Sequence, residues 1–267
     1  MLRRVLYVGL AAAMLVTLSG CGDEKAPGAE GSSGGTVREL TAANFGTSMA
    51  SAQASARSAH LTGTVTAAGQ TFTMSGDVGV GRSIDTMQMG LSMKLGPGKS
   101  IAMRMVDRAF YLKASQGAMT DNPAKPWVKV DLDDPSNPFG AMLDQMLSNF
   151  EPDKVQQLYS AITSLNDLGV DDVNGVSARH YSVTVDTDRM LEVMDFEVPG
   201  VSQEELKQSL PDEVTSQVWL DSENRPVKTT GKTGAGETEM YFTDWGKKVS
   251  ITAPPADQVL PFSQVSR

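Results

Sequence analysis

The residue best placed for covalent chemistry is Cys21, the single cysteine of this 267-residue chain. Cys21 follows two small residues at the end of an apolar run over 5–18, which is itself preceded by Arg3 and Arg4. A basic start, an apolar run and small residues before a cleavage point are the parts of a secretory signal. The run is too short to be a comfortable transmembrane anchor, since a span needs about 20 apolar residues. We therefore expect residues 1–20 to be a cleaved signal segment.

The sequence Leu18-Ser19-Gly20-Cys21 resembles a bacterial lipobox. The resemblance implies cleavage before Cys21, a thioether-linked diacylglycerol on its sulfur and acylation of the new N-terminus. Two or three acyl chains hold a protein on a membrane far more firmly than one. A lone thiol cannot form an internal disulfide in an exported chain, and acylation accounts for its presence. This covalent acyl anchor is the one modification that we expect, and we expect no cofactor.

The other residues capable of chemistry do not follow the spacing of a known active site. The two histidines, His60 and His180, lie outside any H-E-x-x-H or H-x-H arrangement, and the chain offers no second cysteine for zinc. Its one G-x-S-x-G match, residues 31–35, lies in the Gly- and Ser-rich stretch after Cys21 and not between a predicted strand and a predicted helix, so it is no nucleophile elbow. The acidic groups lack the glycine and distal glutamate of a calcium loop, which leaves exposed turns or helix starts as their simplest interpretation. These groups are Asp131, Asp133, Asp134, Asp171, Asp172, Asp186 and Asp188. The sequence predicts no catalytic residue, no metal site and no enzymatic activity.

Charge and composition limit the partners and the number of domains. The chain carries a net charge of −9, and removal of residues 1–20, with two arginines and no acids, makes it more negative. Phosphate contacts need clustered Lys and Arg, so we expect no nucleic-acid partner. Residues 21–37 are nearly free of apolar bulk and predict a flexible tether. Residues 38–267 have the size of one large domain, which we expect to be a monomer.

Hydrophobic periodicity predicts the elements of that domain. Alternation with period two predicts strands over 70–80, 85–95, 101–105, 109–113, 127–132, 181–185, 214–221, 227–232 and 237–245. Helical spacing predicts helices behind Thr41, over 139–150, from 153 to 165, over 187–195 and over 202–209, with an extended tail over 251–255. The apolar stripes of these helices need a partner, and the apolar strand face is the large one available. The expected fold is α+β, with one large antiparallel sheet and helices on one side.

The apolar face of this predicted sheet is unusually rich in methionine. Methionine is flexible and polarisable, so it suits a wall that must fit long and variable apolar chains. The alternative is that the methionines simply fill a core beneath the sheet. The candidate ligand-binding residues are Phe72, Met74, Met87, Met89, Leu91, Met93, Ile101, Met103 and Met105 on the strands and Phe139, Met142, Leu143, Met146, Leu147, Leu158 and Ile162 on the helices.

Several stretches resemble the actinobacterial LppX/LprA/LprF/LprG lipoproteins. They are residues 173–176, 180–186, 218–221, 225–228, 241–246 and 249–255, which include Val218-Trp219-Leu220-Asp221 and Tyr241-Phe242-Thr243-Asp244-Trp245-Gly246. These are strand and turn patterns rather than catalytic signatures. The resemblance implies a LolA-like half-barrel, in which a curved antiparallel sheet wraps around helices. It also implies an apolar cavity between sheet and helices that holds the acyl chains of lipids or glycolipids, although some members lack a large cavity.

The sequence therefore predicts an extracytoplasmic lipoprotein, held on the cell membrane by its lipid anchor, that binds and transfers lipids or glycolipids. Its expected partners are the membrane, the lipid ligand and an envelope lipid transporter. The alternative is a ligand-free interaction or sensor domain on the cell surface. A third class, an enzyme, would need a polar cluster in a cleft.

Overall fold

The computed structural model of the chain describes residues 40–67, 69–79, 84–115, 119–134, 137–148, 152–194, 203–233 and 236–265. The predicted signal segment over 1–20, the predicted acylation site Cys21 and the predicted tether over 21–37 lie outside these residues.

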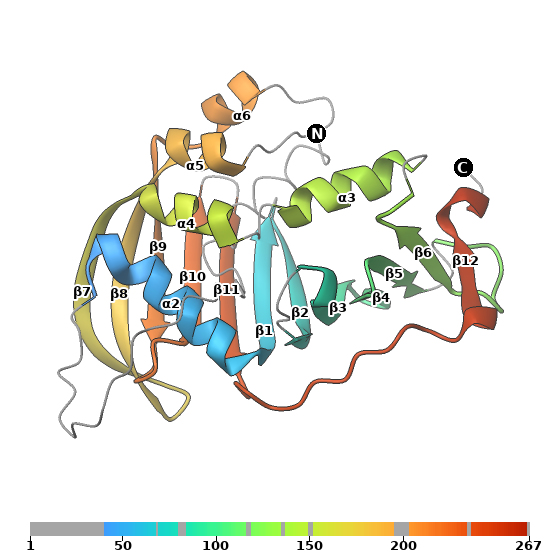
Figure 1. The fold of residues 1–267 in the computed structure, drawn as a ribbon, viewed down its shortest axis with the longest axis horizontal. Helices are drawn as coiled ribbons and strands as arrows, with labels where there is room; N and C mark the ends of the chain where they lie inside the picture. Colours follow the sequence, from blue (N-terminus) through green and yellow to red (C-terminus); the bar gives the residue numbers. More distant parts are fainter. Residues whose placement is uncertain are drawn as a thin grey trace.

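One twelve-stranded sheet forms the frame of the molecule (Figure 1). Its strands are β1 Ser58–Ala67, β2 Gln70–Gly79, β3 Gln88–Gly96, β4 Lys99–Val106, β5 Ala109–Ala114, β6 Trp127–Asp131, β7 Ile162–Val173, β8 Val176–Asp186, β9 Glu213–Leu220, β10 Pro226–Thr233, β11 Gly236–Thr243 and β12 Val259–Pro261. Their order is β12-β6-β5-β4-β3-β2-β1-β11-β10-β9-β8-β7, and every pair is antiparallel except β12 with β6. The predicted α+β fold with one large antiparallel sheet is confirmed.

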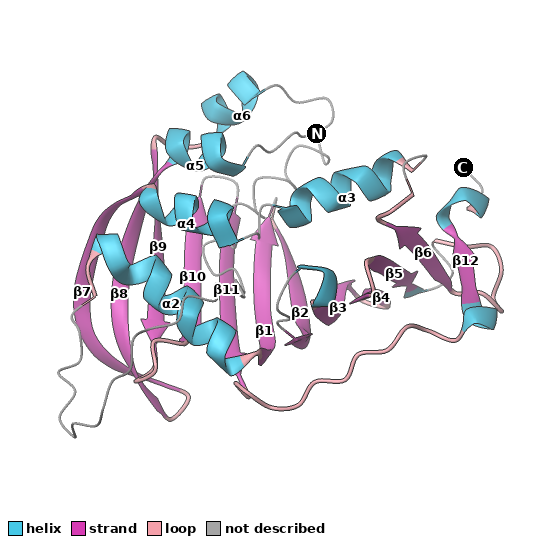
Figure 2. Ribbon diagram, viewed as in Figure 1, coloured by secondary structure: helices cyan, strands magenta, loops and turns pink. Residues whose placement is uncertain are grey.

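Helices lie on one face of this sheet, as Figure 2 shows. They are α2 Ala42–Ala56, α3 Pro138–Ser148, α4 Pro152–Ser160, α5 Thr187–Met194 and α6 Gln203–Ser209, with short 3-10 turns η1 Ile84–Thr86, η3 Ala256–Gln258 and η4 Phe262–Gln264. Helices α2, α4, α5 and α6 pack together over the β7–β9 half, while α3 contacts β6 at the other end. The helix side therefore has two differently covered halves.

Helix α2 shows how small residues allow close packing. Thr41 and Asn44 form a capping box at its start, and Arg57 in the left-handed region ends it. Gly46 faces α4 so closely that a Cβ there would lie 1.8 Å from the ring of Tyr159. The small Ala and Ser side chains of α2 permit this close approach.

The sequence-based assignment of elements was wrong at the start of β7 and at β1. The helix expected from 153 to 165 ends at Ser160, and β7 starts at Ile162. Leu165 lies opposite Val183 of β8, so its helical spacing was coincidental. Strand β1 was not predicted, because Gly63 interrupts the apolar alternation of this strand.

The extended C-terminal tail is confirmed, and it continues into an unpredicted strand. From β11 it runs along the sheet to β12, which pairs with β6 at the far edge (Figure 1). On the way Ile251 lies beside Gly90, and Arg104 Nη1 donates a 3.0 Å hydrogen bond to the carbonyl oxygen of Thr252. The tail thereby ties the edge strand to the middle of the molecule.

Candidate functional site

The strand register places the predicted methionine-rich residues on the helix side of the sheet. Met93 lies between Met74 of β2 and Ile101 of β4. In the neighbouring rows Met89 pairs with Met105, and Leu91 pairs with Met103. Directly opposed Cβ atoms are about 4.5–5.5 Å apart, so these side chains form one continuous apolar surface. We call this surface, formed by Phe72, Met74, Met87, Met89, Leu91, Met93, Ile101, Met103 and Met105, the methionine face.

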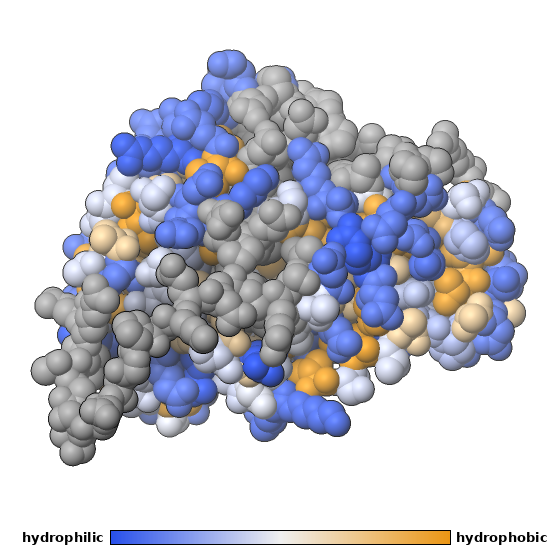
Figure 3. Space-filling model, in the orientation of Figure 1, coloured by the Kyte–Doolittle hydropathy of each residue, from blue (hydrophilic) through white to orange (hydrophobic). Residues whose placement is uncertain are grey.

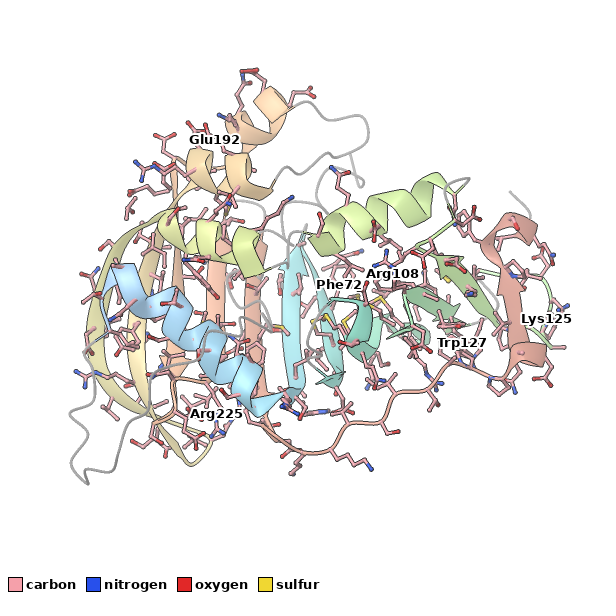
Figure 4. The ribbon with its side chains drawn as sticks, in the orientation of Figure 1. Phe72, Arg108, Lys125, Trp127, Glu192 and Arg225 are labelled. Atoms are coloured by element: carbon pink, nitrogen blue, oxygen red, sulfur yellow. The ribbon has the colours of Figure 1, made fainter. Side chains whose placement is uncertain are left out.

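Most of the methionine face is only partly covered. Met105 is buried, whereas the other eight residues keep intermediate exposure. In Figure 3 apolar residues are visible between polar ones in the half that contains β2–β6, and Figure 4 shows sulfur atoms gathered near Phe72. Neighbouring apolar side chains that stay partly exposed together are typical of a ligand or partner site rather than of a closed core.

Helix α3 covers one end of the methionine face. Leu147 is buried and Leu143 is half-buried in a cluster with Met105, Phe110 and Val130. Phe139, Met142 and Met146 also belong to α3, but their side chains lie outside the described part of the structure.

Leu158 and Ile162 lie elsewhere, in the core beneath α2 and α4. Their cluster contains Phe45, Met49 and Tyr181, and Met49 is fully buried. The rings of Phe45 and Tyr181 pack edge to face with centroids 5.5 Å apart. This half is filled by its own side chains, so the structure does not bring Leu158 and Ile162 together with the methionine face.

Residues of β1 and β11 that were not among the predicted binding residues extend the methionine face toward the middle of the sheet. Leu61, Met240 and Phe242 are buried in a cluster that Met74, Met89 and Leu91 border. Met240 lies over Gly63, where a Cβ would come 2.3 Å from its sulfur. The signal that could have identified β1 is the alternation of apolar residues over 59–65. That alternation becomes regular once Gly63 is counted among the residues on the apolar face.

One arginine fastens the end of the site that α3 covers. Arg108 lies in the β4–β5 turn, where it and Asp107 have φ values of 54° and 50°, as both central residues of a type I′ hairpin turn require. Its guanidinium donates hydrogen bonds of 2.7–2.8 Å to three carboxylates. They belong to Asp85 of η1, to Asp133 in the segment before α3 and to Asp144 of α3. Hydrogen bonds to Asp133 and Asp85 raise the pKa of Arg108 further above its ordinary value. Figure 4 shows Arg108 beneath α3.

The described residues hold no group of three His, Cys, Asp or Glu side chains arranged to bind a metal ion. The arrangement on the helix side is instead suited to noncovalent binding of apolar chains, since polarisable methionine side chains can repack around different shapes.

Comparison with known proteins supports the fold. No protein-family model matches the chain. It is 26% identical over 188 residues to an uncharacterized 31.2 kDa protein of the rplA-rplJ intergenic region of Streptomyces griseus, a match that covers 66% of this chain and 62% of that protein. The structure of the present chain is similar to that of the lipoprotein LppX of Mycobacterium tuberculosis, with a TM-score of 0.53 and 15% identity. The match covers 79% of this chain and 98% of LppX. LprF of Mycobacterium bovis gives a TM-score of 0.50 and 16% identity, with coverage of 80% and 96%. The predicted LppX/LprF type of fold, the LolA-like half-barrel, is confirmed.

Proposed function

We propose that this chain is a membrane-anchored extracytoplasmic lipoprotein that binds a lipid or glycolipid on its methionine face and transfers it within the cell envelope. The observation that carries the proposal is the partial exposure of eight of the nine side chains in the methionine face, beside a half of the same sheet that is fully packed. The likeness to LppX, which is called a lipoprotein, supports it at the level of the fold.

Burial of apolar chains supplies enough free energy for such binding. Each methylene removed from water contributes about 0.8 kcal/mol, so two long acyl chains are held without a covalent bond. A lipid that moves from a bilayer to this surface exchanges one apolar environment for another, so its transfer free energy is far smaller. The same surface can therefore accept and release lipid, which is what a carrier needs.

Helix α3 is the element that we propose to move when lipid enters or leaves. It packs on the methionine face through Leu143 and Leu147 and is fastened from the sheet by Arg108. Contacts of α3 with strands are concentrated on β6, whereas α2 and α4 contact each other and α2 contacts β7. Displacing α3 would leave the β7–β9 core intact, so release would require a conformational change and no reaction.

The proposal places the chain on the outer side of the membrane through Cys21, with an envelope lipid transporter as its loading or receiving partner. No helix in the described part of the chain is long and apolar enough to cross a bilayer. Cys21→Ala should move the protein from the membrane fraction to the medium, or leave it as an unprocessed precursor. Mass spectrometry of the N-terminal peptide tests the anchor, and a Cys21→Ala protein that is still acylated and membrane-bound would contradict it.

The ligand itself is tested by extracting the purified full chain with organic solvent and analysing the extract by mass spectrometry. The expected result is co-purified lipid in near-stoichiometric amount beyond the covalent anchor, and less of it in Met93→Trp, which fills the centre of the methionine face. Absence of lipid, together with a large loss of stability in Met93→Trp, would favour the alternative of a ligand-free interaction domain.

A further inference from the structure

The face of the sheet opposite the methionine face carries a serine, a histidine and an aspartate whose side chains are linked by hydrogen bonds. His60 of β1 lies opposite Asp77 of β2, and its Nδ1 is 2.7 Å from Asp77 Oδ1. Its other ring nitrogen, Nε2, is 3.4 Å from the Oγ of Ser75, two residues earlier on β2. These residues alternate with Leu61, Met74 and Val78 of the helix side, so they share the outer face.

The chemistry of these groups fixes the direction of both hydrogen bonds. An ionised carboxylate only accepts, so Nδ1 of His60 donates to Asp77. Nε2 of the neutral imidazole then carries a lone pair and accepts from the Ser75 hydroxyl. A serine hydrogen-bonded to a histidine that a carboxylate orients is the geometry of an activated nucleophile, whatever the order of the residues in the chain. The 3.4 Å separation lies just beyond the usual 2.6–3.2 Å and within the looser range of unliganded sites.

A groove of about 350 Å³ opens beside Ser75, within the size range of small-ligand sites. Its lining includes Ser75, Ser92, Lys94, Glu239 and Tyr241. The carboxylate of Glu239 is held by Lys228 at 2.7 Å and by the Tyr241 hydroxyl at 2.9 Å. Ser92 lies opposite Ser75, and Lys94 lies opposite Thr73. Lys94 and Ser92 both line the groove, and we assign them as the donors to a developing oxyanion beside Ser75.

We propose that Ser75 is a nucleophile that takes the acyl group of small carboxylic esters, with His60 as its general base and Asp77 as a positioning residue. Ser75 Oγ forms a bond to the ester carbonyl carbon while its proton passes to Nε2 of His60. The bond from that carbon to the alcohol oxygen then breaks, and the alcohol leaves with the same proton. Water deprotonated by His60 hydrolyses the acyl-serine and returns the hydroxyl. This site lies on the face opposite the methionine face and does not depend on lipid binding.

The test uses diisopropyl fluorophosphate, which phosphorylates activated serines with loss of fluoride, on the full chain at neutral pH. We expect one adduct, located on Ser75 by peptide mass spectrometry. Since a general base contributes about 10²–10⁴-fold, His60→Gln should slow its formation at least a hundredfold. Asp77→Asn should slow it as well, and Asp77→Glu should restore part of the rate. Thr71→Ala, a matched change on the same strand and face, should leave the rate unchanged.

Hydrolysis of p-nitrophenyl acetate should show the same ranking, with Ser75→Ala reduced to the background rate of the ester in buffer. All these positions lie on the outer face of the sheet, so we expect every variant to fold. The melting temperature of each variant checks this. Absence of an adduct on Ser75, or an adduct that forms equally fast in His60→Gln, would overturn the proposal and leave His60 and Asp77 as an ordinary cross-strand pair.

Discussion

Replacing Arg108 by methionine should loosen α3 without unfolding the sheet. Methionine keeps much of the apolar stem of the side chain and removes the guanidinium that Asp85, Asp133 and Asp144 share. The side chains of these aspartates are 58%, 64% and 47% exposed, and that of Arg108 is 27% exposed. Exposed ion pairs contribute about 0.2–1 kcal/mol each. Three such pairs, with repulsion among the remaining carboxylates, give an expected loss of about 1–2 kcal/mol.

Urea unfolding of the full chain measures this loss as a change in midpoint at constant slope. Arg179→Met is the matched control, because Arg179 is 56% exposed and its Nε donates a 2.6 Å hydrogen bond to the carboxylate of Asp167 on β7, at the opposite end of the sheet from the β6 strand that α3 contacts. Its expected loss is at most about 1 kcal/mol. High salt should narrow the difference between wild type and Arg108→Met, since screening weakens exposed pairs.

Exchange of a fluorescent lipid between vesicles and the protein should be faster in Arg108→Met and unchanged in Arg179→Met. An Arg108→Met loss no larger than that of Arg179→Met, with the same exchange rate as wild type, would refute the idea that Arg108 fastens α3.

Three further predictions test packing, the methionine face and pH. Gly46→Ala should lower the free energy of unfolding by about 1–3 kcal/mol, because the added methyl group would collide with the ring of Tyr159. An unchanged melting temperature in thermal unfolding would show that α2 and α4 are packed less closely than this. Met93→Trp should change the melting temperature little while reducing lipid retention; a large drop in melting temperature would instead indicate a closed core. The hydrogen bond from Lys129 lowers the pKa of Asp131, so this pair should stabilise the fold above the ordinary Asp pKa of about 4, and the stabilisation should be lost as the pH falls through the lower folded pKa. Asp131→Asn should therefore make the free energy of unfolding less dependent on pH below about 5. Identical acid unfolding of the wild type and Asp131→Asn would contradict this.

The sequence was informative where a local pattern decides the structure. The alternation around Met89 and Met103 identified two strands and the face that they share, because a strand places every second side chain on one side. It was misleading at Ile162 and Leu165, which follow Leu158 at helical spacing although the chain turns into β7 there. Only the contacts with β8 distinguish the two readings, and those come from residues about 20 positions away.

The parts of the candidate sites that could not be predicted depend on register. Nothing local to Arg108 shows that it reaches three aspartates on separate elements. Nothing local to His60 shows that it lies opposite Asp77, because β1 was not recognised and its pairing with β2 fixes that contact. Separation of the packed β7–β9 core from the methionine face likewise arises from where the helices lie on the sheet.

The central claim is that acyl chains lie on the methionine face, and photo-crosslinking tests it most directly. The purified full chain is loaded with a phospholipid that carries a diazirine in one acyl chain, irradiated, digested and analysed by mass spectrometry. We predict adducts in peptides of β2, β3, β4 and α3, and fewer of them in Met93→Trp. Adducts confined to the outer face or to α2 and β7–β9, or no adducts with bound lipid present, would contradict the account.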